Sequence, residues 1–136
     1  MAIENKLKVP DLLILPYPAM SLCVDVVFPS IFYSLSDPIM NVNFLRLCFE
    51  SYIPKDRDPA TDYLLSPIFV PDLVLAKFPP VRMMVGTNDP LRDLSYLFLQ
   101  KCVQLNVDVK LTEFAHLPHG FLNYGIPIVG MHDVSH

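Results

Sequence analysis

The sequence is poor in glycine, and this shortage removes two catalytic motifs. Only four glycines occur among the 136 residues, at positions 86, 120, 125 and 130. None of them brackets a serine, and no two are adjacent. The chain therefore lacks the Gly-x-Ser-x-Gly turn that exposes a nucleophilic serine, and it lacks a Gly-Gly loop that would present backbone amides to an oxyanion.

Charge and cysteine usage exclude further classes of protein. Ten lysines and arginines against fourteen acidic residues give a net charge of −4, with no basic cluster for nucleic acid or an anionic membrane. The three cysteines form no Cys-x-x-Cys pair, so neither zinc nor a disulfide framework is indicated. We expect free thiols in a reducing compartment, and therefore a cytoplasmic protein.

Long apolar runs are also missing. The uncharged run Leu12–Val24 has 13 residues, whereas a helix that spans a bilayer takes about 20. Lys6 and Lys8 precede this run as in a signal peptide, but Asp11 interrupts the junction and no small-residue cleavage pattern follows. We therefore expect neither secretion nor a membrane span.

What the chain does contain is a strand–helix–strand pattern between residues 81 and 121. Val81–Val85 is a short apolar run ended by glycine, and residues 107–111 alternate apolar and polar side chains, so both are predicted to be strands. Asp89-Pro90 is expected to open the helix between them, because Asp caps helices and Pro suits the first turn. Its apolar face is predicted to contain Leu94, Leu97, Phe98, Cys102 and Leu105.

An acid follows the first of these strands and a histidine follows the second. A strand–helix–strand unit makes a right-handed crossover between parallel strands, so Asp89 and His119 should leave the same edge of the sheet. Open α/β sheets place their ligands at that edge. An Asp bound to one imidazole nitrogen fixes the tautomer and leaves the other nitrogen to accept a proton from a hydroxyl. Asp89 and His119 are our candidate catalytic residues.

Each candidate also has a plainer explanation. Asp89 alone could be a helix cap, and His119 beside Gly120 could be a turn residue. His116 is the alternative base, but no glycine follows it, which favours a surface or supporting role. A metal site at His116 and His119 has little support, because no carboxylate or cysteine cluster accompanies them. We expect no metal and no cofactor.

The two motifs carry a family resemblance. Residues 88–93 (Asn-Asp-Pro-Leu-Arg-Asp) and 119–122 (His-Gly-Phe-Leu) resemble the acid and histidine motifs of the hormone-sensitive lipase family of α/β-hydrolases. Residues 9–19 resemble the strand after the family's nucleophile helix, and residues 36–40 and 65–68 resemble later landmarks. The resemblance covers nearly the whole chain. It implies an α/β fold, the C-terminal part of a doubly wound, mostly parallel sheet with a helical cap insertion.

The same resemblance implies a division of the chain. Residues 1–136 would be the C-terminal portion of one domain. Residues 19–65 would be a cap or insertion, with ordinary core packing as the alternative for their apolar stretch. Residues 76–125 would be the core unit that carries Asp89 and His119. The serine elbow would precede Lys6, and residues 127–134 resemble the entry to the last helix. We therefore expect the N-terminal half and the last helix to be absent.

The implied function is carboxylic ester hydrolysis in lipid metabolism, on a small-molecule or lipid ester. In the complete enzyme, His119 would act as the base on the missing serine, and Asp89 would orient it. This chain alone is expected to be inactive. Contact with a lipid surface and the oligomeric state are left open. The alternative function is a non-catalytic truncated paralogue, or an incomplete gene model with no independent activity.

Overall fold

The computed structural model describes residues 2–23, 28–35, 37 and 40–123. The segment 36–40, which resembles one of the family landmarks, is described only in part, because Ser36, Pro38 and Ile39 lie outside the described residues. The same holds for the last two residues of the expected core unit 76–125 and for the expected helix entry at 127–134.

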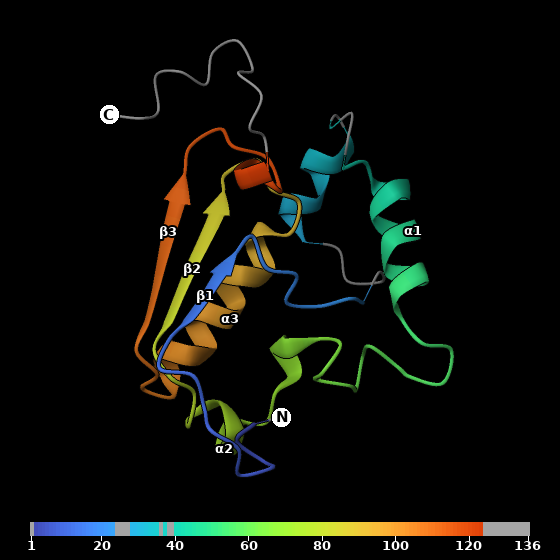
Figure 1. Cartoon of the computed structure of the whole chain (residues 1–136). Helices are drawn as coiled ribbons and strands as arrows, with labels where there is room; N and C mark the ends of the chain where they lie inside the picture. The colour runs from blue at the N-terminus through green and yellow to red at the C-terminus, as the bar shows by residue number, and fades with distance from the viewer. Residues whose placement is uncertain (1, 24–27, 36, 38–39, 124–136) are drawn as a thin grey trace.

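Three parallel strands form one sheet in the order β1-β2-β3 (Figure 1). β1 spans Leu13–Pro16, β2 spans Val81–Gly86 and β3 spans Val109–Phe114. The carboxyl ends of all three strands therefore lie along one edge of the sheet. The predicted α/β architecture, with parallel strands joined by a helical crossover, is confirmed.

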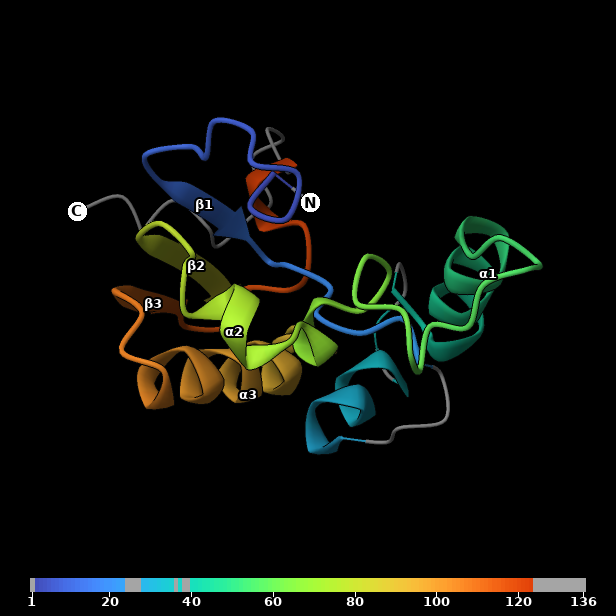
Figure 2. The same ribbon diagram turned by 90° about the horizontal axis from the view of Figure 1, so that it is seen from below.

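Helix α3, Arg92–Gln104, connects β2 to β3 and covers one face of the sheet (Figure 2). Phe98 and Cys102 of α3 pack with Val81 and Met83 of β2 in the core, and each of the four is at most 1% exposed. Burying a side chain such as Phe or Met contributes about 1.5–3 kcal/mol. This packing holds the crossover against the sheet.

Two details of α3 differ from the prediction. Leu97, expected on the buried face, is 40% exposed. At about 100° per residue it lies roughly 60° from Leu94, on the side away from Phe98, and so outside the buried arc. The helix also begins at Arg92, not at Asp89-Pro90, because the Asp89 carboxylate makes its contacts in the turn before the helix.

The other helical segments lie beside the sheet or near one of its two ends. These are the 3-10 helix η1 (Pro29–Leu35), helix α1 (Val42–Tyr52), the 3-10 helix η2 (Pro67–Phe69), helix α2 (Asp72–Leu75) and the 3-10 helix η3 (Phe121–Asn123). The Asn41 side chain caps α1 by accepting the Phe44 N–H at 3.0 Å. The helical spacing of Val42, Leu45, Phe49 and Tyr52 predicts a helix over Asn41–Tyr52, and α1 confirms it.

The apolar face of α1, which contains Val42, Leu45, Phe49 and Tyr52, is only partly buried. Leu45 is buried, but Val42 is 41% and Tyr52 is 71% exposed. α1 lies away from the sheet and contacts η1 instead (Figure 2). Helical spacing predicts the helix but not the segment against which it packs.

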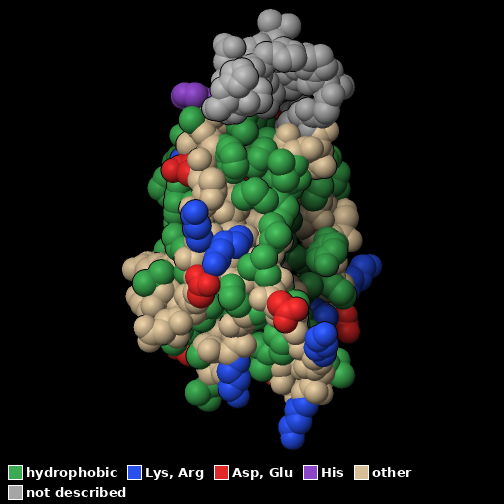
Figure 3. All heavy atoms as spheres, turned by 60° about the vertical axis from the view of Figure 1, so that its left-hand side comes forward, with side chains coloured by type: hydrophobic (Ala, Val, Ile, Leu, Met, Phe, Trp, Pro, Cys, Tyr) green, Lys and Arg blue, Asp and Glu red, His purple; other side chains and the backbone are tan. Residues whose placement is uncertain are grey.

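On the face brought forward in Figure 3, hydrophobic side chains are prominent, with charged ones scattered among them.

Among the described residues, no helix combines the length and apolar character needed to cross a membrane.

Candidate active site

The turn after β2 and the loop after β3 are joined by hydrogen bonds. The Thr87 N–H donates to the Phe114 carbonyl at 2.9 Å, and the Asn88 N–H donates to the Leu117 carbonyl at 3.1 Å. The Thr87 hydroxyl accepts the His116 N–H at 2.7 Å. These contacts extend the strand pairing beyond the sheet, so they fix the distance between side chains carried by the two loops.

Gly86 permits this close approach. A Cβ atom at this position would lie 2.1 Å from the Leu117 carbonyl oxygen, far inside van der Waals contact. Any side chain here would force the two loops apart. Gly120 serves a different purpose, since its φ of +76° is a left-handed conformation that glycine adopts at little cost. It turns the chain from His119 into η3.

Asp89 is buried, and both of its carboxylate oxygens are engaged. Its side chain is 1% exposed. Oδ1 accepts the Leu91 N–H at 2.8 Å, and Oδ2 lies 3.0 Å from His119 Nδ1. Asp89 therefore both stabilises the turn before α3 and contacts the histidine, so the two explanations considered from the sequence are compatible.

His119 is held in one orientation. A carboxylate only accepts hydrogen bonds, so Nδ1–H is the donor to Asp89 and Nε2 is the ring nitrogen left for a hydroxyl. The side chain of His119 is 17% exposed. The ring of Tyr17 packs edge-on against it with centroids 5.1 Å apart, and Phe121 packs against Tyr17 at 5.4 Å. The carboxylate and these aromatic rings together restrict rotation of the imidazole.

The role of Tyr17 was not recognised from the sequence. Tyr17 directly follows β1, and its N–H donates to the Met84 carbonyl at 2.6 Å. Its position after a third parallel strand was a usable signal, because that position places it at the same sheet edge as Asp89 and His119.

His116 occupies a different place from His119. It is exposed and has a φ of +61°, and its backbone makes the contacts to the turn after β2. The expected surface or supporting position agrees with this geometry. The His116 backbone helps to hold the loop that carries His119.

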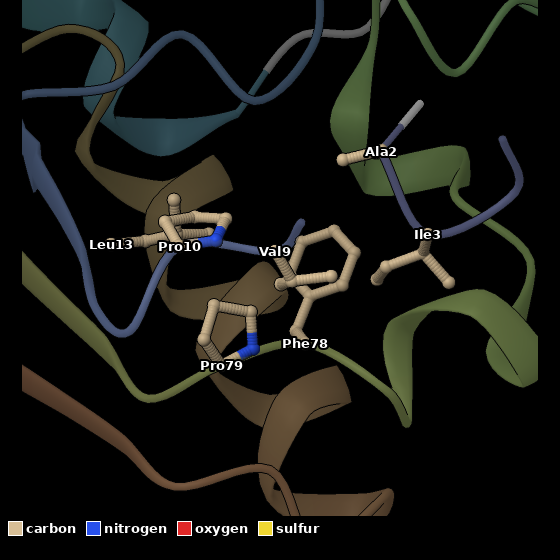
Figure 4. A pocket seen from close by; sticks show the side chains of 7 residues that line it. All are labelled: Ala2, Ile3, Val9, Pro10, Leu13, Phe78 and Pro79. Carbon is tan, nitrogen blue, oxygen red and sulfur yellow. The ribbon is translucent and has the colours of Figure 1, made fainter. Parts of the chain in front are cut away.

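One apolar pocket of the described structure lies away from the carboxyl edge of the sheet. A small apolar pocket at the amino end of the sheet is lined by Ala2, Ile3, Val9, Pro10, Leu13, Phe78 and Pro79 (Figure 4). Asp89 and His119 lie at the carboxyl end, so this pocket is not part of their site. Within the described part of the chain, no group of three or more His, Cys, Asp or Glu side chains could hold a metal ion.

Comparison with known proteins supplies evidence on the family of this chain. A family model described as alpha/beta hydrolase fold matches residues 1–123. Mouse hormone-sensitive lipase is 37% identical over 59 residues, which are 43% of this chain and 8% of that protein. An esterase of Gibberella moniliformis is 32% identical over 95 residues, which are 69% of this chain and 30% of that protein.

Solved structures agree on the fold. A hyperthermophilic esterase from the archaeon Pyrobaculum calidifontis aligns with a TM-score of 0.81 at 24% identity, covering 91% of this chain and 40% of the esterase. This chain thus spans less than half the length of that structure and at most 30% of the two curated relatives.

Proposed function

The chain belongs to the α/β-hydrolase-fold family, with hormone-sensitive lipase and an esterase among its relatives, and on that premise we propose that it supplies the acid and the base of a serine carboxylic ester hydrolase. Asp89 is the acid and His119 is the base. The observation that carries the proposal is the 3.0 Å contact between Asp89 Oδ2 and His119 Nδ1 at the carboxyl edge of the parallel sheet. The serine and the oxyanion amides would belong to a part of the fold outside this chain.

The geometry fits the chemistry of ester hydrolysis. As the serine oxygen bonds to the ester carbonyl carbon, His119 Nε2 accepts the hydroxyl proton, and Asp89 stabilises the resulting imidazolium. The imidazolium then protonates the leaving alcohol, and an acyl-enzyme remains. Water attacks this ester while the same nitrogen takes its proton, and the imidazolium then returns that proton to the serine oxygen as the carboxylic acid leaves. Backbone amides would stabilise the oxyanion in both steps.

We assign residues 19–65 to a cap segment and residues 76–125 to the catalytic core unit. α1 lies away from the sheet, and the cap segment exposes the apolar side chains Phe32, Leu35, Phe44, Leu47 and Tyr52. An apolar pocket of about 420 Å³ lies beside α1 and is lined by Ala19, Leu22, Cys48, Phe49, Tyr52, Leu64, Leu65 and Pro67. Apolar linings of this kind suit an acyl chain, which supports a carboxylic ester with an apolar acyl group as the substrate class.

A second candidate is a non-catalytic protein, in which Asp89 and His119 are not part of a working triad. The observation in its favour is that no serine in the 136 residues is bracketed by glycines. This candidate predicts that Asp89 and His119 have only structural roles, even when a nucleophile is supplied.

The deciding experiment supplies that nucleophile. The chain is joined at Met1 to an upstream half that carries the serine elbow and the oxyanion loop, and hydrolysis of p-nitrophenyl esters is measured. His119→Ala should lower the rate by several orders of magnitude, because triad members act as a unit. His116→Ala is the matched control and should cost about tenfold or less.

Either of two results would overturn the assignment. One is a joined enzyme that hydrolyses esters at the same rate with and without His119. The other is a reversed order of effects in folded variants, with His116→Ala inactive and His119→Ala active. Rates are compared per mole of folded protein, with circular dichroism as the check on folding, because organophosphate labelling of the serine itself depends on the histidine.

A further inference from the structure

Helix α3 begins without a side-chain cap from its own N-cap residue. That residue is the apolar Leu91, which makes no side-chain capping bond. The first amides of a helix have no acceptor within the helix. Here the Asp93 N–H donates to the hydroxyl of Ser30, 63 residues earlier in η1, at 3.3 Å. Ser30 is 1% exposed, so it caps α3 from a distant segment and in a site with little access to water.

The same serine also holds the turn that carries the acid. The Ser30 hydroxyl donates to the Pro90 carbonyl at 2.7 Å, and the Ser30 N–H donates to Asp93 Oδ2 at 2.8 Å. Pro90 directly follows Asp89. Between the two contact points lies Leu91, whose N–H binds Asp89 Oδ1. Ser30 therefore binds the turn on both sides of the contact that orients the Asp89 carboxylate.

A charged pair extends this network to the second loop. Arg92 donates to Asp93 Oδ1 from Nε at 3.1 Å and from Nη2 at 3.0 Å. Its Nη1 donates to the Thr87 carbonyl at 2.8 Å. The Thr87 hydroxyl in turn accepts the His116 N–H. The contacts thus run from η1 through the start of α3 to the loop that carries His119.

We propose that Ser30 is a positioning residue for the Asp89–His119 pair. Its hydroxyl keeps the turn that carries Asp89, here called the acid turn, in the conformation in which Asp89 Oδ2 faces His119 Nδ1. The catalytic meaning of this inference rests on the proposed function. Its structural half can be measured without any enzymatic activity.

Ser34 provides a matched control. It lies in the same 3-10 helix and is 0% exposed, and its hydroxyl donates to the Ile31 carbonyl of that helix at 2.6 Å. Ser30→Ala and Ser34→Ala each remove one buried hydroxyl from η1. The Ser30 hydroxyl, by contrast, is bound to the acid turn, so an effect confined to Ser30→Ala reports on that turn.

The test uses NMR of the nitrogen-15-labelled chain, or of the same chain within the joined enzyme. In Ser30→Ala, exchange of the Asp93 amide should accelerate about fivefold to tenfold, the effect of losing one hydrogen bond. The hydrogen-bonded Nδ1 proton of His119 should broaden or disappear. Ser34→Ala should change neither signal. Ser30→Cys keeps a side chain of similar size with a weak donor and acceptor, and should act in the same direction as Ser30→Ala.

Three results would overturn the proposal. The first is an unchanged signal of the His119 Nδ1 proton in folded Ser30→Ala. The second is an equal effect of Ser30→Ala and Ser34→Ala on the two NMR signals. The third is unfolding of both Ser30→Ala and Ser30→Cys while Ser34→Ala stays folded. In the joined enzyme, Ser30→Ala should lower kcat about tenfold and change KM by less than about twofold. If that enzyme proves inactive, the proposed function fails, while the NMR result still decides the role of Ser30.

Discussion

Asp89 Oδ2 lies 3.0 Å from His119 Nδ1, although 30 residues and the whole of α3 separate the two in sequence. Parallel pairing explains the contact. β2 and β3 end in register at Gly86 and Phe114, and Asp89 and His119 follow these ends by a few residues. Hydrogen bonds between the two loops then hold the side chains together. The pair is therefore a consequence of strand register and of the close approach at Gly86.

Asp89→Asn should severely impair the joined enzyme. An amide in place of the carboxylate can donate to Nδ1 and so favours the wrong imidazole tautomer, and kcat should fall by about 10⁴. The measurement is kcat per mole of folded protein. Asp108→Asn is the control for loss of a carboxylate, because Asp108 lies at the amino end of β3, at the opposite end of the strand from the loop that carries His119. A variant that keeps more than about a tenth of kcat would be incompatible with a triad role.

The 136-residue chain by itself should not hydrolyse p-nitrophenyl esters above a buffer control. Ser21, Ser30, Ser34 and Ser66 are all buried in the described structure, and no serine of the chain has the flanking glycines of a nucleophile elbow. Initial rates with short-chain and long-chain esters check this. Turnover that an organophosphate abolishes, together with labelling of a serine in this chain, would contradict the prediction.

Gly86→Ala should destabilise the fold more than Gly120→Ala. A Cβ on Gly86 meets the Leu117 carbonyl oxygen at 2.1 Å, whereas the nearest atom to a Cβ on Gly120 is Asn123 Nδ2 at 3.7 Å. Overpacking of this kind costs about 1–3 kcal/mol or more. Gly120→Ala has space but places alanine at a positive φ, for about 1–2 kcal/mol. Urea unfolding measures both, and the reverse order would refute the close-approach argument.

Cys102 should resist thiol reagents until the chain unfolds. Burial raises the pKa of its thiol from 9.0 to about 11, so at pH 8 about one thiol in a thousand is ionised. Cys48 is exposed and should react first with a disulfide reagent. Labelling followed by peptide mass analysis distinguishes the two. Equal rates under native conditions would mean that the α3 core is open.

The same shift predicts how stability depends on pH. The pKa of Cys102 is higher in the folded than in the unfolded state, so the unfolded chain loses this proton first as the pH rises. The contribution is therefore fully present below about pH 9 and is lost between about pH 9 and 11. Urea midpoints of the wild type and of Cys102→Ala across this interval provide the test. A loss of stability that is the same in both proteins would assign it to other groups.

Local sequence patterns were sufficient to predict most of the strands and the helix of the core unit. The apolar run 81–85, the helical spacing within 94–105 and the alternation at 107–111 each depend on neighbours within a few residues, so they predict β2, α3 and β3 directly. The handedness and length of the crossover then place Asp89 and His119 at one sheet edge. The absence of glycine around every serine is likewise readable from the sequence alone.

The tertiary structure decided what depends on distant residues. Ser30 reaches Pro90 and Asp93 across 60 and 63 residues, and no short-range pattern encodes such a contact. α1 was predicted as a helix, but its exposed face depends on its neighbours, which helical spacing does not reveal. The sequence therefore determined the strands and the helix of the core unit, and the two residues, Asp89 and His119, that follow these strands at the carboxyl edge of the sheet. Packing decided which further side chains hold them in place, because burial and hydrogen bonding between loops arise only when separate elements meet.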